Sequence, residues 1–253
     1  MQFANPVLML QKRDIIPVYY VQEVSDLSGA SVKAVETLLR FRTSDGDIVH
    51  FSEITADPAE LELGKDTRLL FQDAQKAIAK KLFNNDYKYV GFNISPQHLL
   101  SDEWVSGAIA LCEYVQNNFS HAGIVYEITE MPSADASSES VLLEAIQKLR
   151  HYGAQFAIDD FGKLGSSILR LCMLELEYVK FDRSMVIAAL NNNFAQNLIR
   201  SILAECQKNQ ITVIAEGVEN QEQCSAWQAM NVTLQQGFLF GRPSLFKPQP
   251  IAL

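Results

Sequence analysis

Apolar residues follow two different spacings along this chain, and the two spacings alternate. Between residues 66 and 83 they recur every three or four positions, as on one face of a helix. Short apolar runs such as Tyr89–Phe92 and Ile124–Tyr126 are instead typical of strands. The pattern therefore predicts strands and helices in alternation along most of the chain.

The predicted elements suggest a closed barrel. The expected strands cover residues 17–27, 32–41, 89–93, 123–127, 155–159, 177–180, 211–216 and 235–240. The expected helices cover residues 66–83, 101–118, 138–152, 166–173, 184–208 and 220–230. Strands that alternate with helices favour a parallel sheet, and this many units suggest a (β/α)8 barrel. Since no linker rich in Gly, Ser or Pro divides the chain, we expect residues 1–253 to form a single domain.

Polar side chains stand where the predicted strands end, and one more lies inside an apolar strand. In this class of barrel the active site is built at the carboxyl ends of the strands. A single acid there is most often part of a solvated turn, but here the pattern recurs. The residues concerned are Glu36, Asn93, Glu127, Asp159, Asp160, Lys180, Glu216 and Gln236.

Five carboxylates at one mouth would repel one another unless cations compensate them. No cluster of His or Cys accompanies the acids, and hard oxygen ligands favour Mg²⁺ or Mn²⁺. Several carboxylates around a pair of ions suit hydrolysis of a phosphodiester. The residues alone therefore predict a metal-dependent hydrolase.

Composition excludes several other classes of protein. The formal net charge of −9 argues against DNA binding, which requires a basic surface. No apolar run reaches the ~20 residues of a membrane helix, so no membrane association is expected. The four cysteines are scattered without a CxxC pair, which favours reduced thiols in a cytoplasmic protein.

Seven short motifs, in order from about Tyr19 to Pro243, resemble the EAL-domain phosphodiesterases. This family hydrolyses the bacterial second messenger cyclic di-GMP to linear pGpG. The resemblance implies an α/β fold, a modified TIM (β/α)8 barrel whose first strand is antiparallel to the others. The motifs are Glu36–Arg40, Asn93–Ser95, Glu127–Glu130, Ile158–Gly162, Lys180–Asp182, Ala215–Glu219 and Gln236–Pro243.

The resemblance also implies roles for individual residues, including Mg²⁺ or Mn²⁺ as cofactor with two ions per site. Lys180 corresponds to the lysine that orients or activates the attacking water, and Glu216 to a carboxylate that binds metal or assists as a base. Glu130 corresponds to the acid that braces the loop after residue 160. The implied metal ligands are Glu36, Asn93, Glu127, Asp159, Asp160 and Glu216, and the implied substrate-binding residues are Gln22, Arg40, Glu219 and Gln236.

The chain departs from the family pattern in one loop that matters. After Asp160-Phe161-Gly162 the family usually continues with a small residue, Gly and Tyr, whereas this chain has Lys163-Leu164-Gly165. That loop is tied to metal occupancy and dimer contacts in the family, so we expect a homodimer and a slower enzyme. Two hypotheses remain open: an active cyclic di-GMP phosphodiesterase, or a weak or inactive regulator that binds the nucleotide or a protein partner. We expect any regulatory input to come from another polypeptide or from dimerisation.

Overall fold

The computed structural model describes residues 16–29, 33–49, 65–129, 136–163 and 168–246. The strands are β1 (Ile16–Asp26), β2 (Ala34–Arg42), β3 (Ile48–Val49), β4 (Tyr89–Ile94), β5 (Gly123–Ile128), β6 (Gln155–Phe161), β7 (Tyr178–Phe181), β8 (Thr212–Ala215), β9 (Leu234–Gln235) and β10 (Ser244–Leu245). The helices are α4 (Lys65–Phe83), α5 (Pro96–Leu99), α6 (Asp102–Asn118), α7 (Ala136–His151), α8 (Ile168–Met173), α9 (Arg183–Asn191), α10 (Asn193–Lys208) and α11 (Gln221–Gln228).

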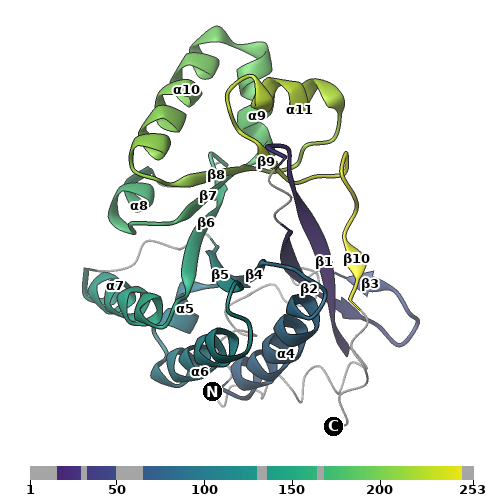
Figure 1. Ribbon diagram of the computed structural model, residues 1–253, viewed down its shortest axis with the longest axis vertical. Helices are drawn as coiled ribbons and strands as arrows, with labels where there is room; N and C mark the ends of the chain where they lie inside the picture. Colours follow the sequence, from purple (N-terminus) through teal and green to yellow (C-terminus); the bar gives the residue numbers. More distant parts are fainter. Residues whose placement is uncertain (1–15, 30–32, 50–64, 130–135, 164–167, 247–253) are drawn as a thin grey trace, which may run out of the picture.

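Eight of the strands close into a mixed barrel (Figure 1). Their order around the barrel is β1, β9, β8, β7, β6, β5, β4 and β2, and β1 pairs with β2 to close the ring. Strand β1 is antiparallel to both of its neighbours, β2 and β9. The remaining neighbours in the ring are parallel. The predicted modified TIM barrel with an antiparallel first strand is therefore confirmed.

The main hydrophobic core lies between the barrel and its outer helices. Alternate residues of β4 and β5, such as Phe92 and Tyr126, face outward into this core, because successive side chains of a strand point to opposite faces. Two tryptophans on the helices pack there. Trp104 of α6 meets Tyr126 edge-on at 5.3 Å between ring centroids, and Trp227 of α11 meets Phe181 at 5.8 Å. The other face of each strand is left for the barrel interior, which is largely polar near one mouth.

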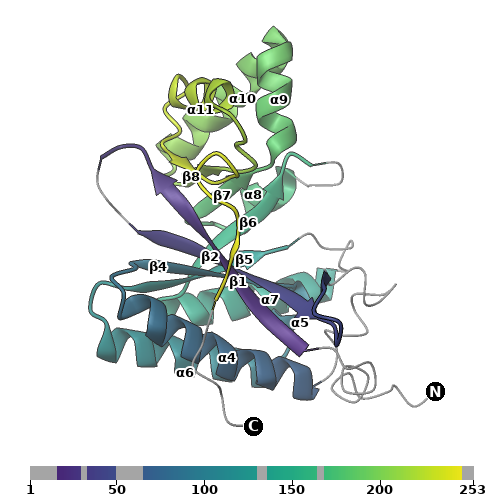
Figure 2. The ribbon, with the colours of Figure 1, turned by 90° about the vertical axis from the view of Figure 1, so that its right-hand side faces the viewer.

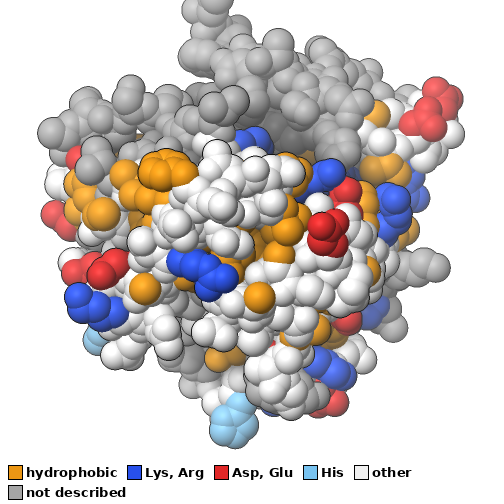
Figure 3. Space-filling model, turned by 90° about the horizontal axis from the view of Figure 1, so that it is seen from above, with side chains coloured by type: hydrophobic (Ala, Val, Ile, Leu, Met, Phe, Trp, Pro, Cys, Tyr) orange, Lys and Arg blue, Asp and Glu red, His pale blue; other side chains and the backbone are white. Residues whose placement is uncertain are grey.

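The helices surround the barrel unevenly. Figure 2 shows α4 and α6 side by side along one part of the barrel wall, with α9, α10 and α11 gathered at the other end of the view. Strand β10 pairs with β1 through Tyr20 and Leu245. Seen from the side of α9–α11, hydrophobic side chains lie at the surface among charged ones (Figure 3). Ile187, Leu190, Phe194 and Leu198, on α9 and α10, are exposed large hydrophobic residues in this part of the chain.

The predicted long helix over residues 184–208 is wrong: the structure has two helices separated at Asn192. The Asn192 backbone is extended, and its side-chain oxygen accepts hydrogen bonds from the backbone N–H groups of Phe194 and Ala195, at 2.8 and 3.3 Å. Asn favours this N-cap arrangement over a place inside a helix, because its side chain competes for backbone hydrogen bonds. The apolar spacing continues across the break, and the run Asn191-Asn192-Asn193 fits either a polar kink or an exposed helix segment.

The last predicted strand, residues 235–240, is also too long. Strand β9 ends at Gln235, and the chain then turns, with Phe240 N–H bonded to the carbonyl of Gly237 at 3.1 Å. Three short elements, β3, α5 and β10, were not expected from the sequence. The other predicted elements are present with small shifts of their ends.

Two of the predictions from composition concern the cysteines and a membrane helix. All four cysteines are free, and Cys172 is exposed while Cys112, Cys206 and Cys224 are buried, in line with the expected reduced thiols. Among the described residues, no helix combines the length and the apolar character needed to cross a bilayer.

Candidate active site

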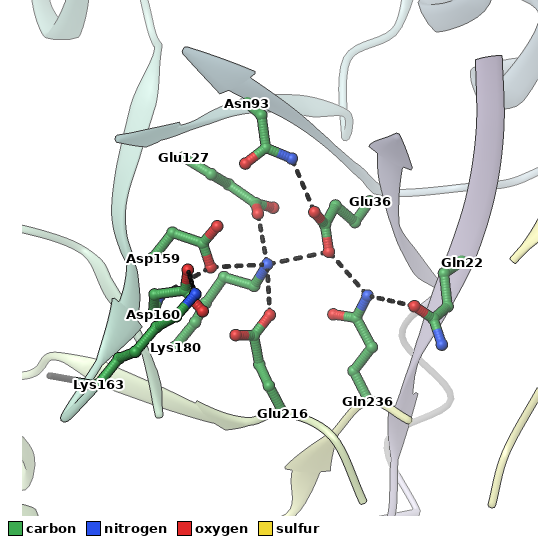
Figure 4. A network of polar contacts seen from close by, with 10 residues as sticks. All are labelled: Gln22, Glu36, Asn93, Glu127, Asp159, Asp160, Lys163, Lys180, Glu216 and Gln236. Carbon is green, nitrogen blue, oxygen red and sulfur yellow. Dashed lines mark hydrogen bonds and ion pairs between the residues drawn. The ribbon is translucent and has the colours of Figure 1, made fainter. Parts of the chain in front are cut away.

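One mouth of the barrel carries a polar network to which almost every strand contributes (Figure 4). Glu36 comes from β2 and Gln22 from β1, while Asn93, Glu127 and Asp159 lie near the carboxyl ends of β4, β5 and β6. Lys180 comes from β7, and Glu216 and Gln236 directly follow β8 and β9. The expectation that these side chains would meet at one mouth is confirmed by their contacts.

The ammonium group of Lys180 lies at the centre of the network. Its side chain is 1% exposed, and Nζ contacts carboxylates from four different parts of the barrel. The distances from Nζ are 3.0 Å to Glu36 Oε2, 2.5 Å to Glu127 Oε2, 3.4 Å to Asp159 Oδ1 and 2.6 Å to Glu216 Oε1. A buried lysine is stable when it is paired and hydrogen-bonded in this way.

Glu36 is held by amide groups as well as by the lysine. Asn93 Nδ2 donates to Glu36 Oε1 at 2.7 Å, and Gln236 Nε2 donates to Glu36 Oε2 at the same distance. The same Gln236 nitrogen donates to Gln22 Oε1 at 3.2 Å, and Gln22 Nε2 donates to the carbonyl of Gly241 at 2.9 Å. The carboxylate that lies inside an apolar strand therefore has a complete set of partners.

The adjacent acids Asp159 and Asp160 both reach the mouth because β6 is irregular there. The register between β6 and β7 shifts between Ile158 and Phe161, and Asp160 adopts φ 55°. Asp tolerates this left-handed conformation better than most residues, and it lets neighbouring side chains avoid opposite faces. The strand was predicted to stop at Asp159 but continues to Phe161. Both carboxylates nevertheless lie at the same mouth, as expected.

Gly91 in β4 makes room for Glu127 of the neighbouring strand. A Cβ atom added at Gly91 would lie 2.1 Å from Glu127 Oε1, far closer than van der Waals contact allows. A glycine inside a strand often marks such a close approach. Gly91 is a site residue that was not expected from the sequence, although a glycine in an otherwise apolar strand is a signal of such a close approach.

The pKa values show that one lysine does not balance the buried acids. Burial raises the pKa of Glu127 to about 8 against the pull of Lys180, and burial likewise raises the pKa of Asp159 and, further, that of Glu216. Burial also acts to raise the pKa of Glu36, but Lys180 and three hydrogen bonds bring it below its usual value. Burial acts to lower the pKa of Lys180, yet the four surrounding carboxylates raise it well above its usual value, so this group stays an ammonium.

The acids form two groups that could each hold a cation. In one group Glu36, Glu127 and Asp159 offer oxygens within 4.8 Å of one another, and in the other Asp159, Asp160 and Glu216 do so. Asp159 is common to both. The donors are hard oxygens, and added positive charge would lower the raised pKa values of the buried acids. The residues present therefore fit a pair of divalent cations that share one carboxylate.

Some predicted site residues lie outside this network. Arg40 Nη1 donates to the carbonyl of Leu39 at 2.8 Å, and burial lowers the pKa of its guanidinium. Glu219 accepts a hydrogen bond from Arg183 Nη1 at 2.5 Å, and Arg183 is a partner that the sequence analysis did not identify. Glu130 lies outside the described residues, as do Leu164 and Gly165 of the altered loop. Lys163 is described and contacts Asp160.

A mixed barrel with an antiparallel first strand and an acidic mouth belongs to the class of modified TIM barrels. Residues 9–243 match the sequence model of the family described as EAL domain. The chain therefore belongs to the EAL domain family, as the motifs indicated.

Relatives and solved structures agree with this assignment. The chain is 28% identical over 246 residues to a protein of Escherichia coli K12 named "Probable cyclic di-GMP phosphodiesterase PdeN", a match that covers 96% of this chain and 46% of the relative. It thus spans less than half the length of that relative. The EAL domain protein from Listeria monocytogenes EGD-e shares the fold at a TM-score of 0.74 and 22% identity, covering 96% of this chain and 94% of the other. The FimX EAL domain of Pseudomonas aeruginosa, solved bound to c-di-GMP, gives 0.75 at 22%, covering 95% and 97%.

Proposed function

We propose that this chain is a cyclic di-GMP phosphodiesterase that opens the cyclic dinucleotide to linear pGpG with Mg²⁺ or Mn²⁺. The observation that carries the proposal is the pair of acid groups sharing Asp159 around the buried Lys180. Relatives named as cyclic di-GMP phosphodiesterases support the choice of substrate. We also propose that the whole chain acts as one domain.

The first cation would be held by Glu36, Asn93, Glu127 and Asp159, and the second by Asp159, Asp160 and Glu216. When bound, the two ions supply a more acidic water and a counter-charge for the phosphate oxygens. The acids come from separate strands of a rigid barrel, so their positions are fixed before the substrate arrives. Such preorganisation is what metal-assisted displacement at phosphorus requires.

Lys180 and Glu216 act on the attacking water. Because its pKa is raised, Lys180 is a donor of hydrogen bonds at neutral pH and orients the attacking water. Glu216 Oε1 lies 2.6 Å from Lys180 Nζ, so this carboxylate is placed beside the water that the lysine orients and is suited to take a proton from it. The water oxygen bonds to phosphorus as one ester P–O bond of the ring breaks, and the proton that Glu216 takes from the water passes to the leaving ribose oxygen.

The nucleotide would be held by Gln22, Gln236, Arg40 and Glu219. Gln236 Oε1 is buried, points toward the acidic cluster in Figure 4 and has no hydrogen-bond partner among the described residues. It is therefore available to accept a hydrogen bond from a ligand. Arg40 lies four residues after Glu36 in β2. It carries the planar guanidinium that suits a phosphate.

A second candidate function is a weak or inactive regulator that binds cyclic di-GMP or a protein partner. The observation that favours it is the ion pair between Lys163 and Asp160, which places a cation on a proposed metal ligand. We further propose a homodimer. The exposed apolar residues of α9 and α10, including Phe194 and Leu198, supply a surface that a second copy could cover.

The deciding experiment measures pGpG formation from cyclic di-GMP in Mg²⁺, in Mn²⁺ and in excess chelator. We expect turnover with either ion, none in chelator, and a loss on the order of 100-fold or more in Glu36→Gln, because a displaced ligand misplaces the reacting groups. Glu113→Gln, at an exposed site on α6, is the control and should keep full activity.

Full activity of folded Glu36→Gln, or turnover in chelator, would overturn the assignment of the site. If the wild-type chain binds cyclic di-GMP in Ca²⁺ but forms no pGpG with Mg²⁺ or Mn²⁺, the regulator replaces the enzyme.

A further inference from the structure

Asp160 has a positively charged partner of its own at the rim of the site. Lys163 Nζ lies 2.9 Å from Asp160 Oδ2, with the lysine side chain 55% and the aspartate side chain 38% exposed. Figure 4 shows Lys163 reaching Asp160 on the outer side of the cluster. This pair is separate from the contacts of Lys180, which join Glu36, Glu127, Asp159 and Glu216.

The two candidate cation positions therefore differ in their surroundings. The inner group, Glu36, Glu127 and Asp159, is buried or half-buried, and its amide partner Asn93 is already in place. The outer group contains Asp160, whose Oδ2 accepts a hydrogen bond from Lys163. A divalent ion that binds Asp160 through this oxygen must displace the ammonium, or approach against its repulsion.

The strength of the Lys163–Asp160 ion pair decides how much it weakens binding of the outer cation. Ion pairs at the surface contribute about 0–1 kcal/mol, because water and salt screen them. Lys163 can therefore be displaced by a divalent ion, so the outer position is weakened and not blocked. Lys180 contacts acids of both groups, so an ion at either position meets that ammonium. Outer-ion binding must in addition exchange the Lys163 ammonium on Asp160 for the ion.

We propose that Lys163 is a built-in competitor of the outer cation, so that the two ions bind with unequal affinity. This inference rests on the proposed metal-dependent function. Occupancy of the outer position, and with it turnover, then follows the concentration of unbound Mg²⁺ or Mn²⁺ while the inner ion stays in place. The residue that departs from the usual loop sequence thereby sets the metal requirement of the site.

The test is a titration of the full chain with Mn²⁺, in which electron paramagnetic resonance counts the unbound ion. For the wild type we expect one tight and one weaker ion per chain. Lys163→Met removes the charge at similar length and should lower the Kd of the weaker ion by about twofold to fivefold. Lys163→Arg keeps the charge and should resemble the wild type. In 1 M KCl the difference between wild type and Lys163→Met should shrink, because the screening length falls to about 3 Å.

Lys208→Met is the matched control. Lys208 also pairs with an acid three residues earlier, Glu205, at 3.7 Å, but on exposed α10. Its titration should match the wild type. The proposal is overturned if Lys163→Met and the wild type bind the weaker ion equally, a result that leaves the phosphodiesterase assignment untouched. If the wild type binds no Mn²⁺ at all, the metal-dependent function fails, and this inference fails with it.

Discussion

Lys180 contacts carboxylates from β2, β5 and β6 and from the residue after β8, so one side chain links much of the barrel mouth. The sequence could place this lysine and its acids at one mouth, because all but Glu36 stand at the end of an apolar run and Glu36 is a carboxylate inside one. It could not show which oxygen meets which donor. It also gave no reason to pair Lys163 with Asp160, since an exposed lysine in a loop has many possible directions.

Gly91 provides a prediction at this scale. Gly91→Ala should lower phosphodiesterase activity on the order of 100-fold, because the new methyl group would displace the Glu127 carboxylate from Lys180 and from the inner cation position. The free energy of unfolding should fall by no more than about 1–3 kcal/mol, as for other overpacked sites. Steady-state kinetics and urea unfolding measure the two effects.

Gly107→Ala is the matched control for this change. A Cβ atom there would also approach a side-chain oxygen, Gln72 Oε1 at 2.2 Å, but on α6 and far from the acids. This variant should keep its activity. Equal activity of Gly91→Ala and the wild type would show that Glu127 tolerates displacement and is not a needed ligand.

At the scale of elements, one arginine ties helix α7 to the segment before β7. Arg150 Nε donates to Glu177 Oε1 at 2.8 Å, and Arg150 Nη2 donates to the carbonyl of Leu174 at 3.2 Å. Glu177 Oε2 in turn accepts the backbone N–H of Phe156 in β6 at 2.7 Å. The ion pair therefore fixes a helix, a connection and a strand relative to one another.

Arg150→Met should lower the free energy of unfolding by about 1–3 kcal/mol, because it removes the donor of Glu177 Oε1 and of the carbonyls of Leu174 and Glu175. The urea midpoint measures the loss. Metal binding at the mouth should not change. Lys148→Met, at an exposed position on the same helix, is the control and should shift the midpoint little. If the two variants are equally stable, the Arg150 contacts contribute nothing measurable.

The elements also show where sequence patterns reach their limit. Helices α4 and α6 were predicted within one or two residues, because an amphipathic spacing ends clearly at a turn. The break at Asn192 was missed because the apolar spacing runs through it, while the capping choice depends on one side chain. The early end of β9 was missed for a similar reason. Its apolar residues continue into a turn, where Phe240 pairs with Gly237.

For the whole molecule, a net charge of −9 and a concentrated acidic mouth make divalent cations a source of stability. A ligand that binds the folded chain alone stabilises it by about 2.7 kcal/mol at a hundredfold excess over Kd. For a chain of this size we expect Mn²⁺ to raise the melting temperature by about 5–10 °C. Differential scanning calorimetry measures this shift against KCl of equal ionic strength.

Glu36→Gln should lose most of that shift, whereas Glu113→Gln should keep it. A shift of the same size in all three proteins would assign the effect to the surface charge and not to the mouth.

The closed barrel itself was only half predictable from the residues: strand and helix alternation indicated a barrel, but the antiparallel β1 came from the resemblance to the EAL family. Local patterns say little about strand direction, because β1 is fixed by distant partners in β2 and β9.

The closure of the barrel by β1 also sets the order in which the mouth can be completed during synthesis. Strand β1 is made well before its partner β9, and Gln236 bonds to Glu36 across 200 residues of chain. Chains grow at about 5–20 residues per second, so Glu36 waits on the order of ten seconds or more for this partner. During that interval the growing chain has an unclosed edge at β1. A chain that stopped before β9 would lack Gln236, a hydrogen-bond donor of Glu36. The network around Glu36 can therefore be complete only after Gln236 has been made.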